Sequence, residues 1–198
     1  LRQVHRQPVV LSLHERSPDA ARVSLLGRSS LYSRAGLRVR GAFSSTWSPQ
    51  PYSVEAWDER DAATAMAPLG MAPESDWILY FPHPSYDTTM LGNTFIWELG
   101  RRTGRYGTRF RFVDVFVNEN GGDLTFADRK GVYAFAEQVK RDSQRVDFEP
   151  LSANGSTGVV EVLDGLKGAA FSKSRLRACS NMSFSRRLIS RAMSLSLM

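Results

Sequence analysis

The 198-residue sequence contains one cysteine, Cys179, and three histidines, His5, His14 and His83. A single cysteine excludes a disulfide within the chain and a zinc site built from several thiolates. The histidines are scattered and none lies near the cysteine, so the pattern does not favour a zinc site of mixed ligands. We therefore predict no metal ligands in this chain and no catalytic role for Cys179.

Long apolar runs are also missing. No stretch approaches the roughly 20 apolar residues that a helix needs to cross a bilayer. Residues 1–5 do not show the charged start and apolar stretch of a signal peptide. We expect a soluble chain of about one domain, without a transmembrane segment. The compartment and the oligomeric state cannot be derived from the sequence.

Acidic residues are absent after Asp164, whereas acids and bases nearly balance before it. The net charge of +6 therefore belongs to the tail, residues 165–198, rather than to the rest of the chain. The basic residues of this tail are Lys167, Lys173, Arg175, Arg177, Arg186, Arg187 and Arg191.

The tail allows three interpretations. Leu188, Ile189, Ala192 and Met193 could line a basic amphipathic helix that binds a membrane surface or nucleic acid. The tail could instead be disordered, or it could be translated in a wrong reading frame after a deletion. The abrupt change of composition favours the third interpretation, and we expect no specific nucleic-acid partner.

Alternating and clustered apolar residues predict short strands, and one longer segment predicts a helix. The expected fold class is α+β, a mainly antiparallel sheet with one major helix packed on it. We expect the helix at 88–103 and the strands at 7–14, 21–26, 37–41, 52–57, 76–81, 110–117, 132–139 and 159–163.

The core is expected between Leu69 and Arg145, where apolar patterning is densest. Within the predicted helix, Leu91, Phe95 and Leu99 share one face with Ile96 beside them, which is typical of a helix packed on a sheet. The periodic aromatic residues are likewise predicted to lie in the core: Trp77, Phe95, Phe110, Phe112 and Phe116.

An ordered series of motifs carries a resemblance to a known family. The series runs through Ala35-Gly36-Leu37-Arg38-Val39-Arg40-Gly41, Pro51-Tyr52-Ser53-Val54-Glu55, Leu69-Gly70-Met71, Asp76-Trp77-Ile78-Leu79-Tyr80, Asn93, Thr108-Arg109-Phe110, Phe116-Val117-Asn118, Gly131-Val132-Tyr133, and Glu137 through Lys140-Arg141 to Arg145-Val146-Asp147. Over residues 35–151 the chain resembles the spore-coat CotH kinase family, whose members have an atypical protein-kinase-like fold.

The resemblance implies a domain organisation and an activity. Residues 35–164 would correspond to the nucleotide-covering N-terminal lobe, residues 1–34 to a lead-in of strands, and residues 165–198 to the tail. The parent activity would be phosphorylation of Ser or Thr on a coat or surface protein, with ATP and Mg²⁺ as cofactors. The family's catalytic aspartate and metal-holding residues lie in a second half that this sequence lacks.

The sequence departs from the family pattern at several basic positions. Pro49 and Gln50 stand where members usually have lysines, and a glutamine offers phosphate only a neutral donor. Gly92-Asn93 replaces the usual Arg-Asn. The family's Glu-Lys-Ile-Lys-Arg run appears here as Glu137-Gln138-Val139-Lys140-Arg141, so Gln138 is neutral where a lysine is usual. Because these positions lack the usual positive charge, one expectation is that the chain binds neither ATP nor Mg²⁺.

The resemblance and the residue chemistry select five cofactor-binding candidates: Glu55, Asn93, Glu137, Lys140 and Arg141. The glutamates could orient a lysine, and the cations could face phosphate together with Arg38 and Arg40. The favoured alternative is that the charged candidates are residues on exposed strand faces, and for Asn93 a polar anchor between helix and sheet is as well supported as a functional role. No catalytic residue is assigned, and no Gly-x-Gly-x-x-Gly or Walker-type loop is present.

Two functions follow as hypotheses. The chain could be a fragment of a CotH-family protein kinase that is inactive alone, with a protein substrate in the parent family. It could instead be a non-enzymatic binding or assembly module.

Overall fold

The computed structural model describes residues 5–82, 85–89, 91–147 and 191–197. The chain forms two compact units. The first comprises residues 1–138 together with 187–198, and the second comprises residues 139–186. All the helices and strands given below belong to the first unit.

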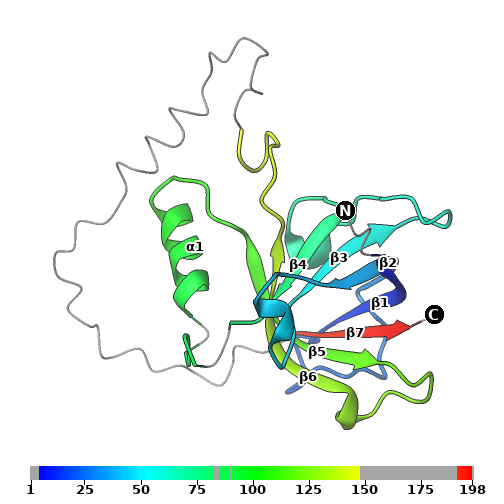
Figure 1. The fold of residues 1–198 in the computed structure, drawn as a ribbon. Coiled ribbons are helices and arrows are strands. Elements are labelled where there is room, and N and C mark those ends of the chain that lie inside the picture. Colours follow the sequence, from blue (N-terminus) through cyan, green and yellow to red (C-terminus); the bar gives the residue numbers. More distant parts are fainter. Residues whose placement is uncertain (1–4, 83–84, 90, 148–190, 198) are drawn as a thin grey trace. The chain divides into compact units, whose positions relative to one another are not determined.

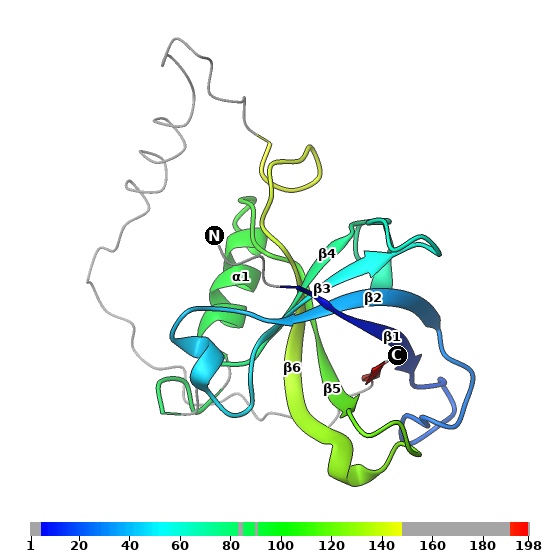
Figure 2. The same ribbon diagram turned by 45° about the vertical axis from the view of Figure 1, so that its right-hand side comes forward.

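The first unit is a closed barrel with the strand order β1-β2-β3-β4-β6-β5-β7 (Figures 1 and 2). Neighbouring strands are antiparallel except for β5 and β7, which are parallel. The strands are β1 Gln7–Glu15, β2 Leu31–Val39, β3 Tyr52–Trp57, β4 Asp76–Tyr80, β5 Phe110–Asn118, β6 Arg129–Glu137 and β7 Arg191–Leu197.

The barrel interior is filled by every second residue of each strand, because successive side chains of a strand point to opposite faces. In β1 the buried apolar residues are Val9, Leu11 and Leu13, and β6 adds Tyr133 and Phe135. The same alternation continues around the barrel, where the buried core also includes Ala35, Leu37, Val54, Ala56, Trp77, Leu79, Val113, Val115, Val117 and Met193.

The predicted α+β fold class, an N-terminal kinase lobe with a major helix, is wrong. The structure is mostly β, and the one α-helix in the described ranges, α1 Gly92–Arg102, has 11 residues. The physical reason is closure: β7 pairs with both β1 and β5, so the sheet has no free edge on which to stop. These pairings join segments far apart in the chain, which local patterns do not reveal.

Helix α1 uses a different face from the predicted one. Phe95, Ile96 and Leu99 are 54%, 58% and 45% exposed, so their predicted packing against the sheet is wrong. The helix contacts the barrel through Trp97, whose ring lies 5.5 Å from Tyr80 and 5.7 Å from Phe110 between centroids. One large aromatic residue therefore anchors this short helix on the outer face of β4 and β5.

The predicted strands fare unevenly. The strand at 52–57 and its pairing with the strand around Leu37 are confirmed, since Leu37 lies opposite Val54. The strand predicted at 21–26 is wrong: this region is a turn-rich connection in which Leu26 is fully exposed, and β2 begins only at Leu31. The strand predicted at 159–163 lies outside the described residues.

Residues 191–197 of the tail form β7, a strand where the spacing of Ala192 and Met193 suggested a helix. The remaining tail residues up to 190, and Met198, lie outside the described part of the chain. The proposed division at residues 34 and 164 stays a prediction. Within the described ranges, no helix has the length and apolar character needed to cross a membrane.

Candidate functional site

Glu137, the last residue of β6, is fully buried, and residues of the same chain contact both of its carboxylate oxygens. Its Oε1 accepts hydrogen bonds from the Tyr106 hydroxyl (3.1 Å) and the Arg109 backbone N–H (3.0 Å). Its Oε2 accepts the Nε–H of Arg109 at 2.9 Å, and Nη2 lies at the same distance. This carboxylate is therefore oriented by an arginine that precedes β5, whereas the sequence suggested a lysine partner.

Glu55 lies on the outer face of β3 in a second ionic cluster. Its Oε2 accepts the indole N–H of Trp57 at 2.7 Å and faces Arg6 Nε at 3.3 Å. Arg6 also contacts Asp76 at 3.2 Å, and Asp76 is the direct cross-strand partner of Glu55. Because two carboxylates stand opposite each other on β3 and β4, the guanidinium of Arg6 offsets their repulsion.

The two glutamates reach the same end of the sheet but on opposite faces. Glu55 pairs with Asp76 and Glu137 pairs with Trp77, and consecutive residues of β4 point to opposite faces. They therefore do not form one site. Lys140 and Arg141 belong to the second unit, where Arg141 forms a β-bridge with Val146.

Asn93, one of the five predicted cofactor-binding residues, lies in the first turn of α1 and contacts a residue that lines a concavity. Its Nδ2 donates to the Tyr80 hydroxyl at 2.7 Å. Tyr80 in turn lines a hollow of about 240 Å³ together with Arg40. Burial raises the pKa of Tyr80, and the hydrogen bond from Asn93 opposes this rise. We call this concavity the arginine hollow; its other lining residues are Gly41, Ser44, Trp47, Pro51 and Phe81.

A close turn shapes one wall of the arginine hollow. Gly41 has a φ of +93°, and a Cβ at this position would meet Ser44 Oγ at 1.9 Å. Only glycine fits both the backbone conformation and this close approach. After this turn, Ser44 and Trp47 line the hollow together with Arg40.

Arg38 is the second-last residue of β2, and Arg40 directly follows this strand; we call these two residues the arginine pair. Neither forms an ion pair with any residue in the described ranges. Burial lowers the pKa of Arg40, and the nearby charge of Arg38 lowers it further. The chain thus holds two like charges close together, one of them half-buried, without a described carboxylate to compensate them.

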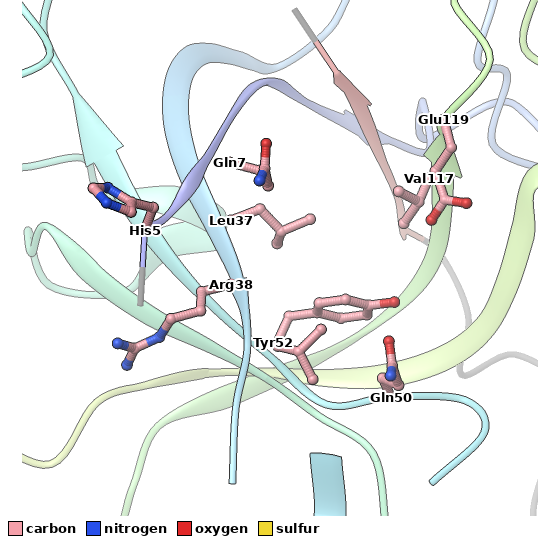
Figure 3. A pocket seen from close by; sticks show the side chains of 9 residues that line it. His5, Gln7, Leu37, Arg38, Gln50, Tyr52, Val117 and Glu119 are labelled. Carbon is pink, nitrogen blue, oxygen red and sulfur yellow. The ribbon is translucent and has the colours of Figure 1, made fainter. Parts of the chain in front are cut away.

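A larger cavity of about 560 Å³ opens at the end of the barrel where β1 and β3 begin and β2 and β5 end. Figure 3 shows Gln7, Leu37, Tyr52, Gln50, Val117 and Glu119 around it, with the Arg38 guanidinium directed away from Val117 and Glu119. His5 and Val39 complete the lining. We call this the mouth cavity.

Gln50 links the wall of the mouth cavity to the segment between β2 and β3. Its side-chain Nε2 donates to the Ser45 backbone carbonyl at 3.1 Å, and the backbone carbonyl of Gln50 accepts a hydrogen bond from the Tyr133 hydroxyl at 3.0 Å. Tyr52 forms the cavity floor, and burial, followed by the charge of Glu119, raises the pKa of its hydroxyl. The position where the family resemblance expects a cation therefore lies on a cavity wall.

Sequence reasoning missed Tyr80, Trp47 and Tyr52 as lining residues. The available signal was their position: each lies at or next to a strand end, or in the turn-rich connection after Gly41. In the described ranges, no three His, Cys, Asp or Glu residues form a group that could hold a metal ion. The arrangement offers cations, amides and aromatic rings, which suit an anionic or aromatic ligand.

Comparison with known proteins agrees with the sequence motifs. Neither a search of curated proteins nor a search of solved structures finds a match. The family model described as CotH kinase protein matches residues 37–178, which confirms the resemblance and extends it beyond residue 151. Because this match covers most of the sequence, the chain belongs to the CotH kinase protein family.

Proposed function

We propose that the first unit is the nucleotide-binding part of a CotH-family protein kinase, with the phosphates of ATP bound by the arginine pair. The observation that carries the proposal is the charge of Arg38 and Arg40, which no acidic residue of the described chain offsets. The family membership supports ATP as the anion.

Phosphate suits this position for electrostatic reasons. Two adjacent guanidinium groups repel each other, and burial of Arg40 removes part of the water that would screen this repulsion. A phosphate between them would relieve the repulsion, and its oxygens can accept paired hydrogen bonds from each planar guanidinium. Within the described ranges, Arg38 and Arg40 supply the positive charges, and ATP would supply the negative charge that pairs with them.

The surroundings of the arginine pair suit the rest of a nucleotide. Trp47 and Tyr80 line the arginine hollow, and aromatic faces can stack on a base. Asn93 fixes the Tyr80 hydroxyl from α1. Gln50, on the wall of the mouth cavity, is neutral where the family resemblance expects a lysine, so we expect the affinity for ATP to be reduced.

We expect no phosphate transfer by this chain alone. The family resemblance places the catalytic aspartate and the Mg²⁺ ligands in a second half of the protein, and phosphoryl transfer requires both. Ser or Thr residues of a coat or surface protein are the proposed substrates of the parent kinase. Purified chain that transfers phosphate from ATP to a protein in a Mg²⁺-dependent way would contradict this expectation.

The proposal is tested by thermal unfolding with and without ATP. A ligand at a hundred times its dissociation constant stabilises the native state by about 2.7 kcal/mol. Gln50→Lys should increase the ATP-induced shift in melting temperature, because it restores a cation beside the pair. Ser24→Lys adds the same charge at an exposed site in the β1–β2 connection and should not. The proposal is contradicted if ATP leaves the melting temperatures of the wild-type chain and both lysine variants unchanged at all concentrations.

A non-enzymatic binding or assembly module is the second candidate. It is favoured by the way in which Glu55 and Glu137 are engaged by Arg6 and Arg109, because the two glutamates predicted to orient a phosphate-binding lysine each pair with an arginine instead. This candidate predicts that Gln50→Lys gains no response to ATP.

A further inference from the structure

Strand β7 occupies a slot between β1 and β5 that has backbone partners on both sides. Residues 191–197 pair antiparallel with β1 from Val9 to Glu15, and residues 192–196 pair parallel with β5 from Asp114 to Asn118. Figure 1 shows β7 between these two strands. Without β7, the facing edges of β1 and β5 would each present unpaired N–H and C=O groups. An extended segment in this slot therefore gains two hydrogen-bonded ladders at once.

The slot favours a segment with apolar residues at alternate positions. Val9, Leu11 and Leu13 of β1 are fully buried, and their register partners are Leu197, Leu195 and Met193. The side chain of Met193 is itself fully buried in the barrel core. Serines occupy the alternate register positions 194 and 196, so the segment repeats the two-residue period that a half-buried strand requires.

Many residues separate β7 in the sequence from the two strands that flank it. The other neighbouring strands follow one another directly in the sequence, apart from β4 and β6, whereas residues 148–190 lie between β7 and the end of the preceding described segment. No short turn therefore ties β7 to either of the strands that flank it, and residues 191–197 of one molecule are not restricted by a tight connection to the barrel of the same molecule.

We propose that the slot between β1 and β5 accepts residues 191–197 of a second copy of this chain, giving an assembly by strand exchange. The exchanged contacts are identical to those within one chain, since the same seven residues enter the same slot in the same register. The exchange therefore loses no hydrogen bond and no buried contact of β7. Its extent is set by protein concentration, because association of two copies competes with insertion of a copy's own strand.

Paired cysteines in the full-length chain test this proposal. Ser12 and Ser194 are direct register partners, and such residues place their Cβ atoms about 4.5–5.5 Å apart, near the separation of a disulfide. Cys179→Ser first removes the native thiol. One protein then carries Ser12→Cys and another, distinguishable by mass, carries Ser194→Cys.

The two proteins are mixed, equilibrated at several concentrations and oxidised. We expect a disulfide-linked heterodimer whose yield rises with concentration and exceeds, several-fold, that of a control pair. The control combines Ser12→Cys with Ser24→Cys, which lies in the β1–β2 connection and has no register partner on β7. The double variant Ser12→Cys/Ser194→Cys should give monomeric and dimeric disulfides, with the dimeric share rising as concentration increases.

Two results would overturn the proposal. One is a heterodimer yield equal to that of the control at every concentration, with only a monomeric disulfide in the double variant; β7 then closes its own barrel exclusively. The other is the absence of any disulfide in the double variant, which would mean that β7 does not lie beside β1. Neither result depends on ATP, so the nucleotide-binding proposal is tested separately.

Discussion

Glu137 at the end of β6 and the arginine pair at the end of β2 differ in whether the chain itself supplies an opposite charge. Glu137 is fully buried, yet Arg109 and Tyr106 provide an ion pair and hydrogen bonds to both of its oxygens. Arg38 and Arg40 form no ion pair in the described ranges. The first arrangement is internally complete, and the second requires an external anion.

This difference separates stability from binding. Removing one partner of a complete buried cluster leaves the other charge uncompensated, which destabilises the native state. Removing a charge that has no partner relieves repulsion and leaves stability nearly unchanged. The same comparison therefore predicts opposite consequences for mutations at charged residues of the two regions.

The largest loss of stability is expected for Glu137→Gln. The substitution leaves Arg109 without its carboxylate, and breaking a buried ion pair in this way typically costs about 3–5 kcal/mol. Urea unfolding followed by circular dichroism measures the change. Glu59→Gln, at an exposed residue in the β3–β4 connection, is the matched control and should change stability little. A loss below about 1 kcal/mol for Glu137→Gln would show that the buried cluster is not structural.

A smaller loss is expected for Arg6→Gln. Arg6 offsets the facing carboxylates of Glu55 and Asp76, but all three side chains are partly exposed to water. Partly exposed ion pairs contribute about 1 kcal/mol or less, and salt screens them. The same unfolding measurement in low and high salt should show a loss that shrinks as salt is added. A loss as large as that of Glu137→Gln would remove the proposed distinction between buried and surface clusters.

No loss of stability is expected for the double variant Arg38→Gln/Arg40→Gln in the absence of ligand. Removing two like charges close together should leave the free energy of unfolding unchanged or slightly higher. Arg28→Gln, which removes an exposed arginine in the β1–β2 connection, is the control. Clear destabilisation of the double variant alone would mean that the arginine pair has a structural partner after all.

His14 extends the comparison to a group that the chain accommodates in its neutral form. Its ring is buried, Nδ1 has no hydrogen-bond partner among the described residues, and burial lowers its pKa from 6.5. The unfolded chain then binds a proton more readily, so stability should fall as pH drops through about 6.5. His14→Gln should flatten this part of the curve of stability against pH. An equally steep decline in the variant would assign the effect to other groups.

Local patterns predicted much of the barrel wall but not its closure. Alternation in residues such as Tyr52 to Trp57 marks a strand directly, and the pairing of β3 with β2 was predicted from it. The position of β7 depends on partners in β1 and β5 that are distant in the sequence, and no periodicity encodes them. The apolar spacing of Phe95 and Leu99 predicted a packed helix face, whereas Trp97 makes the contact with the barrel.

The candidate site was predictable in its residue types more than in its geometry. Arg38 and Arg40 were recognised as cations, and Gln50 as a departure from the family pattern. The sequence alone does not show whether a charged residue already has a partner of opposite charge. In the structure Glu137 pairs with Arg109 and Glu55 pairs with Arg6, and both arginines are distant in the sequence. The roles of Glu55, Asn93, Glu137, Lys140 and Arg141 in cofactor binding stay predictions.

The most direct test of the account is calorimetric titration of ATP into the wild-type chain, the Arg38→Gln/Arg40→Gln variant and the Arg28→Gln control. A hydrogen bond to a charged group contributes about 1.5–3 kcal/mol, and 1.4 kcal/mol corresponds to tenfold in affinity. The account predicts that the double variant binds ATP at least about tenfold more weakly than the other two proteins. Equal affinity in all three proteins would contradict it, because the charges that the chain leaves unpaired would not be those that hold the nucleotide.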